Sequence, residues 1–168
     1  MPNIADYLNK RDLETIGRFT ATWALFEQEI FAKKCKMAEI DSVISSGEIT
    51  NENLEYLTSA LRKEMIACSG STNNSLLNLK FRSKNRNDNT SKFRRKQTQL
   101  WLNETILCTY QIPIWVIFRI RCNMFHGEKT LWNLHRQKDI FEICTEILEF
   151  YVREKENSDV CTPLGAQQ

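Results

Sequence analysis

Residues 112–118 read Ile112-Pro-Ile-Trp-Val-Ile-Phe118, the strongest apolar run in a chain of 168 residues. Pro113 suits the first turn of a helix, where its missing N–H costs no hydrogen bond. The sequence continues as Arg119-Ile-Arg-Cys-Asn-Met-Phe-His126, and Gly127 then favours a helix end. The first half of this helix is apolar nearly all round, so we expect it to lie in the centre of the domain. The run is far shorter than the roughly 18 apolar residues that span a bilayer, so we expect no transmembrane segment here.

Helical spacing of apolar residues recurs on both sides of this run, whereas no segment alternates with period two. Asp12 is a plausible N-cap for the first helix, and Thr50 for the second. The sequence therefore predicts an all-α bundle of about four to five helices in one domain over residues 1–168, with one long basic loop and a flexible tail at 157–168. Besides the central helix, the expected helices cover residues 11–37, the segment from Thr50 to about 69, 100–110 and 138–155.

Positive charge is concentrated in residues 80–96, although the whole chain carries only +2. Eight Lys and Arg residues stand against one Asp there, so this stretch carries +7 and the rest of the chain −5. Its Asn and Asp residues favour a loop. Clustered cations gain affinity for RNA by releasing counterions from phosphates, and Phe81 and Phe93 are suited to stack on bases. The alternatives are a solvated loop or a surface for an acidic partner. The RNA-binding candidates are Lys80, Arg82, Lys84, Arg86, Lys92, Arg94, Arg95 and Lys96.

Six cysteines and two histidines show no spacing typical of a structural zinc site, because no C-x-x-C pair is present. We therefore expect no metal and no cofactor. The first residues lack a basic segment followed by an apolar one, so a secretory signal is not expected. A cytoplasmic protein with free thiols follows from this interpretation.

The chemically informative stretch is Arg121-Cys-Asn-Met-Phe-His126-Gly127. On a regular helix, side chains five residues apart lie about 140° apart around the axis, so Arg121 and His126 do not meet there. They converge if the helix loosens at His126, which Gly127 permits, or if a second copy of the site faces the first across a two-fold axis. Asn123 is placed to add an amide to the same site.

This stretch resembles the Arg-x4-6-His motif of HEPN domains, which are small helical bundles common in prokaryotic toxins, phage-exclusion systems and CRISPR effectors. Residues 18–27 are also similar to the first helix of some HEPN families. Many members carry Asn, Asp or His directly after the motif Arg, whereas this chain has Cys122 there and Asn123 next.

The resemblance implies metal-independent RNA cleavage at a composite site of a homodimer, by a toxin or defence effector that an antitoxin or other regulatory protein controls. The catalytic residues it implies are Arg121, Asn123 and His126. An imidazole with a pKa near 6.5 transfers protons at neutral pH, and a guanidinium offers a planar fork of donors to phosphate oxygens. Attack of a ribose 2′-OH on the adjacent phosphate would then leave a 2′,3′-cyclic phosphate and a 5′-hydroxyl.

Several alternatives stay open. Arg119 would also satisfy the motif, with six intervening residues, and Glu27 would support the site if it turns toward Arg121. A structural interpretation pairs Arg121 with an acidic neighbour and places His126 as a C-terminal helix cap. The alternative functions are a non-catalytic helical module that binds RNA or protein, which Cys122 favours, and a nucleic-acid-binding regulator that works through residues 80–96.

Overall fold

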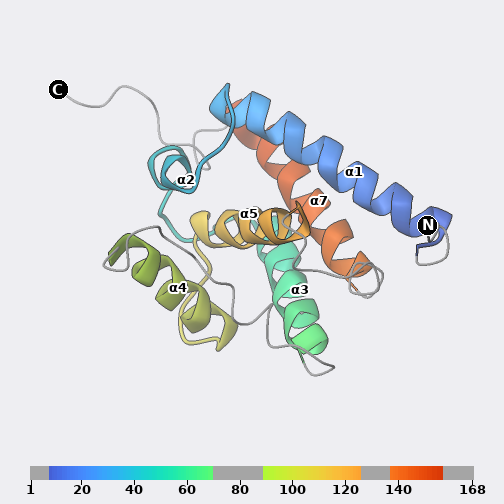
Figure 1. The fold of residues 1–168 in the computed structure, drawn as a ribbon. Coiled ribbons are helices and arrows are strands. Elements are labelled where there is room, and N and C mark those ends of the chain that lie inside the picture. The colour runs from blue at the N-terminus through green and yellow to red at the C-terminus, as the bar shows by residue number, and fades with distance from the viewer. Residues whose placement is uncertain (1–7, 70–88, 126–136, 157–168) are drawn as a thin grey trace.

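The structure of the chain is a computed structural model that describes residues 8–69, 89–125 and 137–156. Within these ranges the chain is all-helical and contains no strand, which confirms the predicted fold class. The described ranges hold six α-helices, arranged as Figure 1 shows, and their buried side chains form one hydrophobic core. The helices are α1 (Lys10–Phe26), α2 (Met37–Val43), α3 (Glu52–Ser69), α4 (Asn89–Leu102), α5 (Gln111–Phe125) and α7 (Lys138–Arg153).

The first helix ends well before the predicted boundary at residue 37. Its N-cap is Asn9, whose side chain accepts from the N–H of Asp12 at 2.9 Å while the Asp12 carboxylate accepts from the Asn9 N–H. The prediction that Asp12 is the N-cap was therefore wrong, because Asp12 is the third residue of the helix and closes the capping box from that position. After α1 the chain forms a π-helical turn over Glu27–Phe31 and then reverses at Ala32, which has a left-handed φ of 53°.

The segment between α2 and α3 pairs with a part of the chain far away in sequence. An isolated antiparallel bridge joins Glu48 to Thr109, and the N–H of Tyr110 donates to the carbonyl of Gly47 at 3.1 Å. Asn51 directly precedes helix α3 and caps it, because its Oδ1 accepts from two backbone N–H groups of the first turn. The expected cap, Thr50, lies instead with its hydroxyl 3.2 Å from that of Tyr110.

Helix α4 covers residues that the sequence analysis assigned to two different elements. Its first part was predicted to be a loop, and its last residues were predicted to start another helix. Residues 89–96 belong to this helix, so the basic loop predicted for 80–96 does not extend over them. The predicted helix 100–110 was also wrong, because α4 ends at Leu102. The N–H groups of Thr105 and Glu104 donate to the carbonyls of Leu100 and Trp101, and Glu104 has a left-handed φ of 57°. This is a Schellman motif, which ends a helix.

Helix α5 lies in the centre of the molecule, as predicted (Figure 1). Ile114, Val116 and Ile117 are fully buried, and Pro113 lies in the first turn. The described part of the chain forms no helix that is both long enough and apolar enough to cross a membrane.

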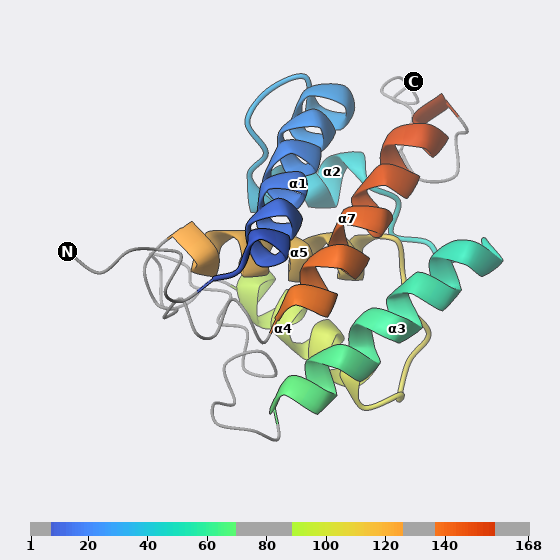
Figure 2. The same cartoon turned by 90° about the vertical axis from the view of Figure 1, so that its right-hand side faces the viewer.

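The most extensive helix–helix contact joins α1 to α7. The two helices run parallel, because Thr15 bonds to Glu142 near their first turns and Phe26 packs on Tyr151 near their last turns (Figure 2). Helix α7 closely matches the predicted helix 138–155, with a short 3₁₀ turn over Glu154–Glu156 at its end. Its buried stripe includes Ile140, Cys144, Ile147 and Leu148.

Candidate functional site

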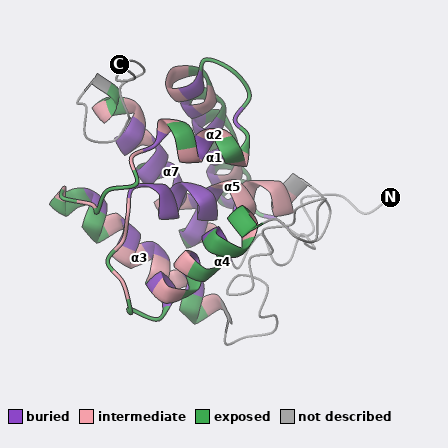
Figure 3. Ribbon diagram, turned by 90° about the vertical axis from the view of Figure 1, so that its left-hand side faces the viewer, coloured by how far each residue is buried: buried purple, intermediate pink, exposed green. Residues whose placement is uncertain are grey.

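The C-terminal half of α5 emerges from the core and carries the polar residues of the predicted motif. Arg119, Arg121, Cys122 and Asn123 are each half-buried, whereas Ile120 between them is fully buried. Figure 3 shows the change along α5 from mainly buried to intermediate residues. The helix is therefore fixed by its apolar half, and its polar half lies at the edge of the core.

Arg121 lies on an aromatic surface that α1 provides. Its guanidinium carbon is 5.8 Å from the centroid of the Trp23 ring, which is a cation–π distance. Trp23 is 2% exposed and packs against Phe26 and Phe118, with ring centroids 5.5 and 5.9 Å away. Helical spacing of apolar residues in this segment is enough to predict that Trp23 is buried, but it gives no sign that the indole also contacts Arg121.

Arg119 and Asn123 form a second polar pair on the same helix. Nη2 of Arg119 donates to Oδ1 of Asn123 at 3.4 Å across one helical turn. Arg119 and Arg121 are two residues apart, so they point about 200° apart around the axis. The structure thus brings Asn123 to Arg119 and gives Arg121 a separate setting on Trp23.

Glu27 lies in the π-helical turn and contacts the next segment of the chain. Its Oε1 accepts from the backbone N–H of Cys35 at 3.0 Å. Burial and the carboxylates of Glu27 and Glu39 raise the pKa of the Cys35 thiol far above its ordinary value, while the charge of Arg121 opposes this rise. Glu27 and Arg121 therefore both act on the Cys35 thiol, and they shift its pKa in opposite directions.

The cysteines provide a first testable prediction. The five described cysteines are free thiols, and burial raises the pKa of Cys108 to about 12. At pH 8 this leaves Cys35 and Cys108 almost wholly as thiols, so we expect iodoacetamide to alkylate them at least a hundredfold more slowly than in the denatured chain. Peptide mass spectrometry of quenched samples measures the rates, and labelling in urea is the control. Equal alkylation rates in the folded and denatured chain would contradict the burial and the raised pKa of these two thiols.

The cations predicted to bind RNA fall into three groups. Lys80, Arg82, Lys84 and Arg86 lie outside the described residues, as does His126 of the motif. Lys92, Arg95 and Lys96 are exposed on α4. The prediction that Arg94 binds RNA was wrong. This side chain is only 6% exposed and donates from Nε and Nη2 to the Asp41 carboxylate. It holds α4 to α2 and does not face solvent.

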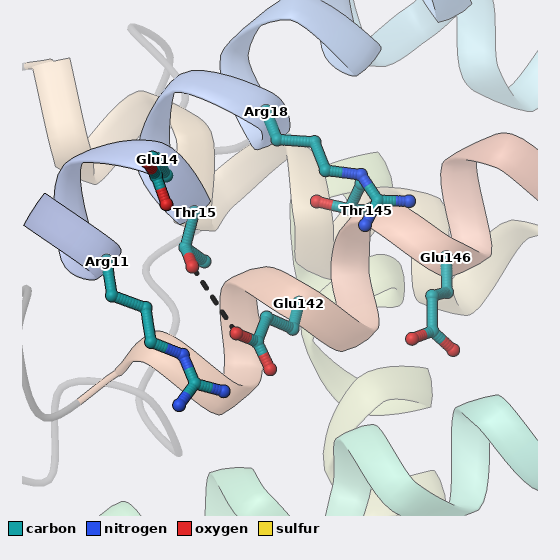
Figure 4. Close-up of a pocket in the computed structure, with 7 residues that line it drawn as sticks. All are labelled: Arg11, Glu14, Thr15, Arg18, Glu142, Thr145 and Glu146. Carbon is teal, nitrogen blue, oxygen red and sulfur yellow. Dashed lines mark hydrogen bonds between the residues drawn. The ribbon is translucent and has the colours of Figure 1, made fainter.

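A surface pocket of about 310 Å³ lies between α1 and α7, and none of the predicted site residues lines it (Figure 4). Its walls carry two arginines, three glutamates and two threonines. Glu142 accepts from Thr15 at 3.3 Å and lies 3.5 Å from the Lys138 ammonium, and Arg18 pairs with Glu149 at 2.7 Å. Much of the charge around this pocket is thus compensated within the protein, and the pocket is not the site that the motif predicts.

Metal ligation has no geometric basis in the described ranges, where no three side chains of His, Cys, Asp or Glu are grouped so that they could hold an ion. No family model, curated protein or solved structure was found to match the chain.

Proposed function

We propose that this chain is a metal-independent endoribonuclease of the HEPN type, acting in the cytoplasm as a toxin or defence effector. The observation that supports this proposal is the placement of Arg121 at the end of a buried helix, with its guanidinium on Trp23. A phosphate needs a cation of fixed orientation, and an arginine on an aromatic face loses less side-chain freedom when it binds.

In the proposed reaction the 2′-OH of a ribose attacks the adjacent phosphorus, and the bond to the 5′-oxygen of the next nucleotide breaks. His126 takes the proton of the attacking hydroxyl or gives one to the leaving oxygen. Arg121 donates to the phosphate oxygens, whose charge grows as the phosphorane forms. Asn123, bonded to Arg119, supports the edge of the site. The products carry a 2′,3′-cyclic phosphate and a 5′-hydroxyl.

One chain supplies one motif histidine, whereas the reaction needs both a base and an acid. We therefore propose a homodimer in which two copies of the motif share one cleft. An antitoxin or other regulatory protein would control such an activity by covering this cleft.

The proposal is tested by incubating the purified chain with total RNA in EDTA. We expect fragments with cyclic-phosphate ends, and we expect His126→Ala to lower the cleavage rate by about 10²- to 10⁴-fold because proton transfer is lost. Size-exclusion chromatography checks that the variant is still dimeric. Intact RNA from a folded, dimeric wild-type sample would refute the enzymatic proposal.

The second candidate function is a non-catalytic module that binds RNA or protein. The exposed cations of α4 favour it, because they lie on a helix other than the one that carries the motif. Cys122 favours it as well, since many HEPN members have a polar residue directly after the motif Arg. RNA retention without cleavage would select this function.

A further inference from the structure

The exposed face of α4 combines cations with one aromatic ring. Lys92, Arg95 and Lys96 are exposed, and α4 contains no acidic residue. Phe93 is 53% exposed in spite of its size. At about 100° per residue, Lys92 and Lys96 lie at the middle of this face and Phe93 lies on one flank, one helical turn from Lys96.

The Phe93 ring is held in position from beneath. It packs edge-on against Trp115 of α5, with ring centroids 6.4 Å apart and an interplanar angle of 79°. Trp115 is 2% exposed, and its Nε1 donates to the Asp41 carboxylate at 2.8 Å. The ring therefore has a fixed base in the core, while much of its surface faces solvent.

Asp41 fixes the neighbouring residue of α4 as well. Arg94 directly follows Phe93 and donates to the same carboxylate that accepts from Trp115. Gln111, in the first turn of α5, donates to the carbonyls of Asp41 and Ile44 at 3.1 and 2.9 Å. One carboxylate thus sets the position of α4 relative to α5, and with it the position of Phe93 above Trp115.

We propose that Phe93, Lys92 and Lys96 form a binding platform for unpaired nucleotides, and that the substrate class of this protein is single-stranded RNA. An exposed ring in a fixed position stacks on a splayed base at little entropic cost, and each stacked base contributes strongly to affinity. The lysines contact the flanking phosphates. A duplex can contact only the lysines, through its phosphates, because its bases are stacked on one another and are not free to stack on Phe93. An acidic protein would likewise need the cations and not the ring.

The inference rests on the proposed function, because it assumes that the bound polymer is RNA. It does not require that the RNA is cleaved. Binding is therefore measured with a fluorescent 2′-O-methyl RNA, which lacks the attacking hydroxyl, so that a failure of the platform and a failure of the nuclease are distinguishable. Anisotropy is recorded for the single strand and for the same strand annealed to its complement, at about 0.1 M salt, where surface charges still act.

We expect the full-length chain to prefer the single strand, and Phe93→Leu to lower its affinity for that strand by about tenfold or more. The affinity for the duplex should stay unchanged, and Phe93→Tyr, which keeps a ring, should restore tight binding. Lys96→Ala should weaken binding to both forms and lower the salt dependence by about one released ion.

Matched controls are available on α3. Tyr56 is 73% exposed and Lys63 is exposed, so Tyr56→Leu and Lys63→Ala remove the same kinds of group from another surface. Equal affinity of the wild type for both RNA forms would overturn the proposal, as would a Phe93→Leu chain that binds the single strand normally. Tight binding of polyglutamate that displaces RNA regardless of Phe93 would assign this face to an acidic protein instead.

Discussion

Replacing Arg121 with alanine is expected to lower the rate of RNA cleavage by about 10²- to 10³-fold, the usual cost of losing one donor to a transition-state oxyanion. The guanidinium lies 5.8 Å from the Trp23 ring centroid, so its position is set before substrate binds. Its loss should therefore affect the chemical step more than RNA binding. Single-turnover cleavage of a labelled RNA in EDTA separates the two effects.

Three further variants sharpen this prediction. Arg121→Lys keeps the charge but loses the planar fork of donors, so we expect an intermediate rate. Arg153→Ala removes an exposed arginine at the end of α7 and should leave the rate unchanged. A normal rate for Arg121→Ala together with a large loss for Arg119→Ala would move the phosphate contact to Arg119 and contradict the role proposed for Arg121.

Asp41→Ala should lower the free energy of unfolding by about 3 kcal/mol, since it leaves a buried arginine without its counter-charge. The Arg94 side chain is only 7% exposed, and Asp41 also accepts from the Trp115 indole at 2.8 Å. The substitution therefore leaves two buried donors without this acceptor. Urea denaturation followed by circular dichroism measures the loss.

Asp41→Asn keeps an acceptor of nearly the same shape, and we expect it to lose less stability than Asp41→Ala. Glu55 is exposed on α3, so Glu55→Ala is the control and should change stability by no more than about 0.5 kcal/mol. The double variant Asp41→Leu with Arg94→Met removes both charges and should be more stable than Asp41→Ala alone. Equal stability of Asp41→Ala and Glu55→Ala would show that the ion pair contributes little.

The helices that bury a regular apolar stripe could be predicted from the sequence. Helix α7 shows this, because Ile140, Cys144, Ile147 and Leu148 recur on one face and are all fully buried. Helix α5 was predicted for a related reason, since its first half is apolar on every side. In both helices local sequence and tertiary burial favour the same structure.

Helix α4 could not be predicted in this way, because its buried face is only partly apolar. Arg94, Thr98 and Trp101 lie at helical spacing and face the core, yet the first two are polar. The burial of Arg94 depends on its ion pair with Asp41, which is about fifty residues earlier in the chain. The end of α4 could not be predicted either, since the residue that adopts the left-handed conformation there is Glu104 and not the usual glycine.

The candidate site was predictable only in part. The motif on α5 follows from local sequence, and the structure places Arg119, Arg121 and Asn123 at the half-buried end of that helix. The support by Trp23 and the bond from Cys35 to Glu27 both arise from the packing of α1 and its π-helical turn against other elements. Such contacts join segments that no spacing rule connects.

The parallel pairing of α1 with α7 has a consequence for how the chain reaches its native state during synthesis. Thr15 meets Glu142 across 127 positions of sequence, and Arg18 meets Glu149 across 131. Such distant partners slow folding, because a long loop must close before the contact forms. While the ribosome is still making the middle of the chain, Phe19 and Phe26 have no α7 to cover them. The nascent chain thus exposes these aromatic side chains until α7 has been made, which leaves α1 open to non-native association in the meantime.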